Sequence, residues 1–208
     1  NVVLVDMRDR YRSEGSGEYF HSASPHTGRD GYDIVEWIAA QPWSNGRVGT
    51  VGSSHAGQVQ VRTALERPPH LSAIWPDVVT TNNYANCARE GGAMQGHMFW
   101  ALLIHAQDAQ EVLHDPTLSG QVWDDLKSLR QLYRATPWQR GQTSLRLVPT
   151  LEDVLMRYYT RGAYDDWWAS EACDYTAHFQ RHVDVPMTVS SGWFDPWAGP
   201  DADYWAAM

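Results

Sequence analysis

A serine lies at the centre of a strand–turn–helix pattern in residues 48–57, Val-Gly-Thr-Val-Gly-Ser-Ser-His-Ala-Gly. Small and β-branched residues lead into the turn, and a helix-compatible run over residues 58–66 follows it. Gly52 and Ala56 leave room for a strand and a helix to approach closely. The pattern predicts a nucleophile elbow, in which Ser54 adopts a strained backbone conformation with its hydroxyl above the edge of a sheet.

The residue after the serine supplies a second element of this hypothesis. The backbone N–H of His55 would point to the place where the oxyanion of an acyl-transfer intermediate forms. The N-terminus of the following helix adds partial positive charge there. A Gly/Ser-rich loop without any chemistry is the alternative, because Gly-Ser-Ser triplets are common in loops.

A serine nucleophile needs a general base, and the base needs a carboxylate that orients it. In α/β-hydrolases the order along the chain is Ser, then Asp or Glu, then His, and the acid follows a later strand. Asp195 has this place, because it follows the apolar run 185–191 and the turn-permitting Gly192. We therefore predict Asp195 as the acceptor for a histidine Nδ1–H. A turn aspartate before Pro196 is the alternative without chemistry.

The histidine that this order requires does not follow Asp195, although the sequence contains nine histidines. His55 is adjacent to the predicted nucleophile and would point away from its hydroxyl in an elbow. His97 and His105 fit surface or packing positions better than the position of a base. No pair of histidines has the spacing of metal ligands, so we predict neither a metal nor a cofactor.

Composition and charge narrow the classes of partner. The formal net charge of −9 argues against a nucleic-acid partner. No apolar run is long enough to span a membrane. The 11 tryptophans are compatible with an aromatic or sugar pocket, but packing in the core explains them more simply. Cys87 and Cys173 match no metal or redox spacing, and we predict two unpaired thiols.

Strand-like and helix-like runs alternate in the first part of the chain. Residues 31–41, with Asp30 as N-cap, have the spacing of an amphipathic helix. This helix lies between two strand-like runs, so the sequence predicts a βαβ unit, a parallel sheet and a right-handed crossover. Strands are predicted over residues 1–6, 47–52, 71–79 and 185–191.

The pattern changes to polar segments with helical periodicity in the middle of the chain, where helices are predicted over residues 98–111, 121–133 and 151–160. We expect residues 1–79 to be the first part of an α/β core with the elbow. Residues 80–162 would form a helical cap, and residues 163–208 would return to the core with the predicted acid. The chain opens inside an apparent strand at Asn1 and stops after an aromatic segment at Met208, so we expect a fragment cut at both ends.

A set of motifs follows a fixed order through nearly the whole chain. They are Asp6-Met7-Arg8, Ser13-Glu14-Gly15, Asp30-Gly31-Tyr32-Asp33, Glu36-Trp37, Gln41-Pro42-Trp43-Ser44-Asn45-Gly46-Arg47-Val48-Gly49, the elbow, Tyr164-Asp165-Asp166-Trp167-Trp168 and Gly192-Trp193-Phe194-Asp195. Together they resemble the X-Pro dipeptidyl-peptidase (S15) and cocaine esterase family. That family also includes α-amino acid ester hydrolases and cephalosporin acylases.

The resemblance implies an α/β-hydrolase core with a helical cap, without the C-terminal jelly roll of complete members. It implies a serine hydrolase with Ser54 as nucleophile, Asp195 as triad acid and the His55 N–H as one oxyanion donor. The family takes its triad histidine from beyond residue 208 and its second oxyanion donor, a tyrosine, from upstream of this chain. The implied substrate is a small-molecule or short-peptide ester or amide. Family members are commonly oligomeric, so a homo-oligomer stays open.

Two departures from the family pattern keep other functions open. His55 stands where the family usually has tyrosine, and residues 6–13 lack both glycines of the family's Asp-x-Arg-Gly-x-Gly-x-Ser loop. Such losses fit harmless divergence or a weak or inactive member. A non-catalytic α/β-hydrolase-like binding module is therefore one alternative. A second alternative, an aromatic-lined carbohydrate-binding protein, rests only on the number of tryptophans. Residues 1–208 alone are expected to show little or no turnover, and a cytoplasmic and a secreted location both stay open.

Overall fold

A computed structural model describes residues 1–15 and 26–208. They form two compact units. The first unit contains Asn1, residues 26–87 and Asp166–Met208, and it combines strands with helices. The second contains residues 2–15 and Ala88–Asp165, and its regular structure is helical.

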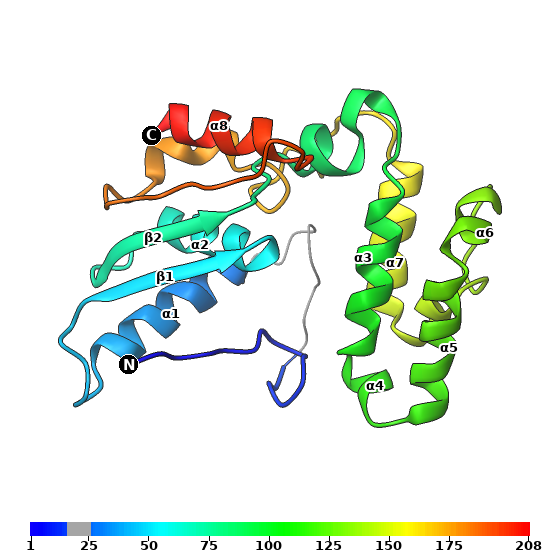
Figure 1. Cartoon of the computed structure of the whole chain (residues 1–208), viewed down its shortest axis with the longest axis horizontal. Helices are drawn as coiled ribbons and strands as arrows, with labels where there is room; N and C mark the ends of the chain where they lie inside the picture. The colour runs from blue at the N-terminus through cyan, green and yellow to red at the C-terminus, as the bar shows by residue number, and fades with distance from the viewer. Residues whose placement is uncertain (16–25) are drawn as a thin grey trace. The chain divides into compact units, whose positions relative to one another are not determined.

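Two parallel strands, β1 (Val48–Ser53) and β2 (Leu71–Asp77), form the sheet of the first unit (Figure 1). Helix α2 (His55–Leu65) connects them. Ser53 pairs with Asp77, so both strands end at the same edge of the sheet. The strands predicted over residues 47–52 and 71–79 are confirmed to within two residues at each end. The helix predicted after the elbow is also confirmed, but it begins three residues earlier.

The segment predicted as a strand over residues 185–191 runs parallel to β2 without forming a regular strand. It pairs with β2 through isolated bridges that join Ile74 to Met187 and Asp77 to Ser190. The prediction of a continuous strand is therefore wrong, whereas the predicted return of the chain to the sheet is confirmed.

A proline explains the interruption of this pairing. Ile74 uses both backbone groups, since its N–H donates to Pro186 O (3.0 Å) and its carbonyl accepts from Thr188 N–H (3.1 Å). The next bond of a parallel ladder would need an N–H at Pro76, which has none. The pairing resumes at the N–H of Val78, which donates to the segment at 2.9 Å.

Residues 1–6, predicted as a buried strand, are extended but belong to no strand in the described part of the chain. Their side chains are open to solvent, with Val2 at 88% and Leu4 at 92% exposure. This prediction is wrong. An apolar run becomes a buried strand only where a neighbouring strand pairs with its backbone and other elements cover its side chains.

Helix α1 (Thr27–Ala39) packs against α2. Its N-cap is His26, so the predicted cap at Asp30 is wrong. Asp30 lies instead in the first turn, where its charge complements the helix dipole. The crossing of the two helices is tight, because a Cβ on Gly31 would lie 1.8 Å from the Thr63 hydroxyl oxygen.

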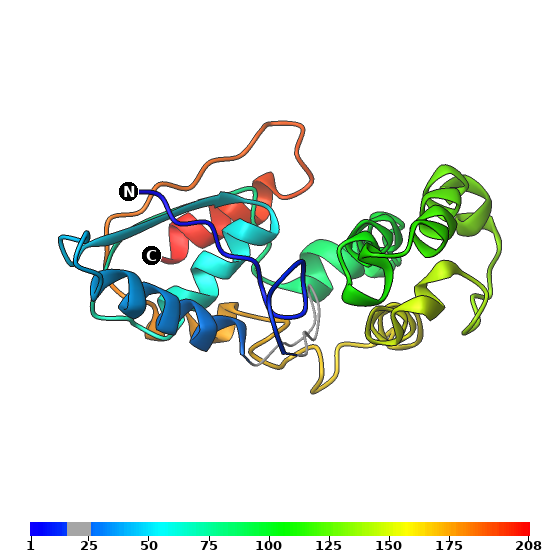
Figure 2. The same cartoon turned by 90° about the horizontal axis from the view of Figure 1, so that it is seen from below.

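Helices α1 and α2 lie on the same side of the two strands (Figure 2). Val35 of α1 joins a core cluster with both strands, whose other buried members are Val48, Ala64, Leu71 and Ile74. Helix α8 (Ala198–Ala207), which the sequence analysis did not predict, closes a second cluster through Tyr204. That cluster also contains Val61, Leu65, Val79 and Tyr175.

The second unit contains α3 (His97–Gln107), α4 (Gln110–Leu113), α5 (Pro116–Lys127), α6 (Leu129–Arg134) and α7 (Pro149–Thr160). The helix predicted over residues 151–160 is confirmed, and those predicted over 98–111 and 121–133 are each divided in two. The start of α5 lies five residues before its predicted position, because Asp115 caps the helix. Its carboxylate accepts the N–H groups of Thr117 (2.8 Å) and Leu118 (3.2 Å).

Four short helical segments complete the described structure: η1 (Tyr84–Ala88), η2 (Glu90–Gly92), η3 (Ser144–Leu147) and η4 (Thr176–Arg181). Cys87 and Cys173 are both buried as thiols. None of the described helices combines the length and apolar character that crossing a bilayer requires.

Candidate active site

Ser54 joins the end of β1 to α2 with φ 58° and ψ −124°. This conformation is sparsely populated for a residue with a side chain, so it persists only where the surroundings hold it. The Ser54 N–H donates to Asp77 O across the sheet edge (2.9 Å), and its carbonyl accepts from Gly57 N–H (2.9 Å). The side chain is exposed. The strained backbone that the sequence predicted for Ser54 is therefore present.

Two glycines allow the close approach of strand and helix around this serine. A Cβ on Gly52 would lie 2.7 Å from Ala56 Cβ. A Cβ on Gly57 would lie 2.5 Å from a methyl carbon of Val79 and 2.8 Å from Asp77 O. Any side chain at these two positions would have to displace the helix or the neighbouring strand.

His55 is the first residue of α2. Its N–H therefore belongs to the first turn, where backbone N–H groups have no acceptor within the helix and the dipole is positive. The environment next to the exposed serine thus favours negative charge. The ring of His55 is half-buried.

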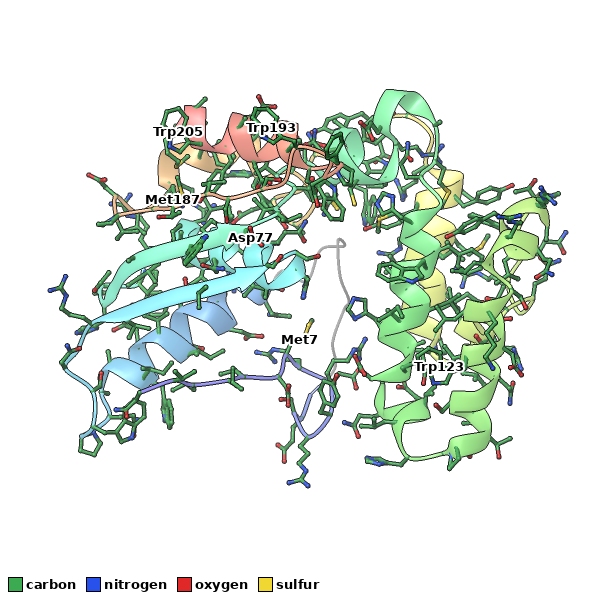
Figure 3. All side chains as sticks on the ribbon, in the orientation of Figure 1. Met7, Asp77, Trp123, Met187, Trp193 and Trp205 are labelled. Atoms are coloured by element: carbon green, nitrogen blue, oxygen red, sulfur yellow. The ribbon has the colours of Figure 1, made fainter. Side chains whose placement is uncertain are left out.

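Asp195 lies beyond the same sheet edge as Ser54, because the segment before it runs parallel to β2 and is bridged to Asp77 through Ser190. Figure 3 shows Asp77 at the end of β2 and Met187 on the adjacent segment. The Asp195 carboxylate is half-buried and accepts the N–H of Trp197 at 2.9 Å. Asp195 therefore has a turn role, on the segment that is bridged to the end of β2.

Two further aspartates, which the sequence analysis did not single out, accompany Asp195. Burial raises the pKa of Asp201, and the charges of Asp195 and Asp77 act in the same direction, while hydrogen bonds from Val79 N–H and Ser191 oppose the shift. Asp201 thus lies close enough to both Asp77 and Asp195 for their charges to act on it. A useful signal in the sequence was the position of Asp77 near the end of the predicted strand 71–79.

A hydrogen-bond chain ties the Asp77 carboxylate to the segment before Asp195. The indole N–H of Trp75 donates to Ser190 Oγ (2.8 Å), and this hydroxyl donates to Asp77 Oδ1 (2.6 Å). The backbone carbonyl of Asp77 remains the acceptor for Ser54. Asp77 therefore supports the turn at Ser54 through its backbone, while its side chain links β2 to the segment that carries Asp195.

His70 and His182, both in the first unit, form hydrogen bonds through their rings with groups other than Ser54. His70, just before β2, bonds through Nδ1 to Glu36 (2.7 Å) at the opposite end of the strand from Asp77. His182 contacts Val183 O through Nδ1 and the Tyr204 hydroxyl through Nε2, both at 2.7 Å. These rings stabilise the fold.

The two other histidines considered in the sequence analysis belong to the second unit. His97 and His105 lie on α3 in the second unit, and burial lowers the pKa of His97. Within residues 1–15 and 26–208, no group of three or more His, Cys, Asp or Glu side chains is arranged to hold a metal ion.

Comparison with known proteins gives a family match over the entire chain. Residues 1–208 match the family described as X-Pro dipeptidyl-peptidase (S15 family). The cocaine esterase of Rhodococcus sp. (strain MB1 Bresler) is 27% identical over 211 aligned residues, which cover 95% of this chain and 34% of that protein. The chain therefore spans about a third of the length of this relative.

Solved structures show a similar fold. A crystal structure of an aminopeptidase from a marine sediment archaeon, Thaumarchaeota archaeon, has a TM-score of 0.62 at 19% identity, with 94% of this chain and 33% of that chain covered. A CocE/NonD family hydrolase from Staphylococcus aureus has a TM-score of 0.51 at 19% identity, with 93% and 33% covered. The chain has an α/β fold of the α/β-hydrolase type, as predicted. Because the family match includes every residue, the chain belongs to the X-Pro dipeptidyl-peptidase (S15) family.

Proposed function

We propose that the protein carrying this chain is a serine hydrolase that cleaves an ester or amide acyl bond through an acyl-enzyme. The observation that carries this proposal is the backbone of Ser54, which has φ 58° between the end of β1 and the N-terminus of α2. This geometry presents an exposed hydroxyl beside the positive end of a helix. Membership of the S15 family and the cocaine esterase relative support the same chemistry.

In the proposed mechanism Ser54 Oγ attacks the acyl carbonyl carbon while a histidine takes its proton. The carbonyl oxygen becomes an oxyanion, and the His55 N–H and the α2 dipole stabilise it. The intermediate then collapses, and the leaving group departs with the proton from the histidine. Water, deprotonated by the same histidine, attacks the acyl-enzyme and releases the acid and free Ser54.

Asp195 orients the histidine in this proposal by accepting its Nδ1–H. The histidine itself comes from beyond residue 208, and a second oxyanion donor, a tyrosine, comes from upstream. His70 and His182 bond to other partners, and the proposal does not assign this role to them.

The test compares Ser54→Ala with Ser53→Ala in the full-length protein. Ser53 is also exposed and directly precedes Ser54 at the end of β1, so it is a matched control. A panel of aryl esters and X-Pro amides measures turnover, and a fluorophosphonate probe measures covalent labelling. We expect Ser54→Ala to lose about 10⁴–10⁶ in kcat and to lose labelling, while Ser53→Ala keeps both.

Near-full activity in Ser54→Ala would overturn the assignment of the nucleophile. A wild-type protein that neither turns over any substrate of the panel nor reacts with the probe would instead support the non-catalytic binding module.

A further inference from the structure

A glutamine side chain is buried behind the elbow. Gln60 lies on α2, six residues after Ser54, and it is 4% exposed. A primary amide withdrawn from water is destabilising unless its donors and acceptors are all paired. The hydrogen-bond partners of Gln60 therefore indicate which part of the fold this buried amide stabilises.

The amide nitrogen of Gln60 donates to three backbone carbonyls. These belong to Gly52 (3.1 Å), Ala56 (3.2 Å) and Trp75 (3.0 Å). Its oxygen accepts from Trp75 N–H (3.1 Å) and from the Thr50 hydroxyl (2.9 Å). A primary amide has two N–H groups and an oxygen with two lone pairs. Three carbonyls accept from the two N–H groups of Gln60, so one N–H is shared between two carbonyls and every hydrogen-bonding group of the amide is used.

These partners lie on both sides of the predicted nucleophile. Gly52 precedes Ser54 by two residues on β1, and Ala56 follows it by two residues on α2. Trp75 lies on β2, two residues before the carbonyl of Asp77 that accepts the Ser54 N–H. One amide therefore joins the two ends of the turn to each other and to the strand that holds Ser54.

We propose that Gln60 is a positioning residue, whose side-chain amide holds the elbow turn in its strained conformation. A residue with positive φ and a side chain relaxes to a more populated conformation unless its neighbours are fixed. Gln60 fixes the carbonyls of Gly52 and Ala56 against β2. The effect on turnover rests on the proposed function, whereas the effect on the elbow backbone does not.

Gln60→Met is the primary variant, because methionine has a similar length and no amide. A displacement of the nucleophile by about 1 Å can cost on the order of 10² in rate. We expect kcat to fall by about 10²-fold with little change in KM, because Gln60 is buried and contacts backbone and Thr50.

Gln60→Glu is a second variant, because glutamate has the same shape as glutamine. It retains an acceptor for Trp75 N–H, but it places a carboxylate against the carbonyls of Gly52 and Ala56. We expect the same split between kcat and KM. This variant keeps the proposal testable if Gln60→Met does not fold.

Gln58→Met is the matched control. Gln58 lies on the same helix and is also 4% exposed, but its amide donates to Thr80 O (3.4 Å), beyond β2. The two methionine variants remove the same chemical group at the same burial. We expect Gln58→Met to keep kcat within tenfold of wild type.

Residue-resolved hydrogen exchange of the Ser54 and Gly57 amides provides a measurement that does not depend on activity. We expect both amides to exchange faster in Gln60→Met than in Gln58→Met or wild type. Equal exchange and equal kcat in the two variants would overturn the role of Gln60. Faster exchange in Gln60→Met in a protein without any Ser54-dependent turnover would retain the positioning role and reject the proposed function.

Discussion

Gly52 and Ala56 approach each other across Ser54 so closely that a methyl group on Gly52 would lie 2.7 Å from the Cβ of Ala56. The carbonyl oxygen of Ala56 would lie 3.1 Å from the same methyl group. Because helix backbone cannot turn aside as a flexible side chain does, the clash must be relieved by moving β1 or α2. The tightness of the turn at Ser54 is therefore a property of packing between β1 and α2.

Gly52→Ala should destabilise the protein by about 1–3 kcal/mol, the usual cost of inserting a methyl group into a closely packed site. The free energy of unfolding in urea measures this loss. Gly49→Ala on the same strand is the control, because its Cβ would lie 3.7 Å from Ala73 O, an ordinary contact. Equal stability of the two variants would show that strand and helix are not in close contact at Gly52.

Asp195→Asn separates the turn role of Asp195 from its proposed triad role. Asparagine keeps the Oδ1 that accepts the Trp197 N–H, so the turn before α8 should persist. It cannot orient the histidine as a carboxylate does, and the expected loss in kcat is about 10⁴-fold. Steady-state kinetics of the full-length protein measures this loss, with the exposed Asp203→Asn as control. Unchanged kcat in a normally folded Asp195→Asn protein would leave Asp195 only its turn role.

The pair of His182 and Tyr204 should make the fold sensitive to acid. Burial lowers the pKa of His182, as does the charge of Arg67, although the hydrogen bond to Val183 O acts in the opposite direction. The unfolded state, with a histidine pKa of about 6.5, therefore binds more protons just below that pH than the folded state does. The free energy of unfolding should fall as the pH decreases below about 6.5.

Urea unfolding between pH 8 and pH 5 measures this dependence. His182→Gln, which carries no charge at any of these values, should show a shallower decrease than wild type. Protonation at Nε2 would also place a donor against the Tyr204 hydroxyl, which bonds to this nitrogen at 2.7 Å. Identical slopes in the two proteins would exclude His182 as a source of the acid sensitivity.

Sequence patterns predicted β1, α2 and β2 of the first unit, because their conformation depends mainly on residues that are close in the sequence. The strand before Ser54 and the helix after it follow from residue types within about ten positions. The prediction failed for residues 1–6, all but the first of which belong to the second unit. They have apolar character but no strand partner in the described part of the chain. It failed in part for residues 185–191, because Pro76 on the neighbouring strand removes one bond of the ladder.

By itself, the sequence determined that a strand, a tight turn at Ser54 and a helix follow one another. Gly52, Ser54 and Gly57 are close in the chain, and the sterics of a single turn leave them few alternative conformations. Tertiary structure decided what holds that turn. The carbonyl of Asp77 and both backbone groups of Trp75 reach the elbow from a different strand. Such contacts depend on which strands become neighbours and in what register, and this is set by packing between distant segments.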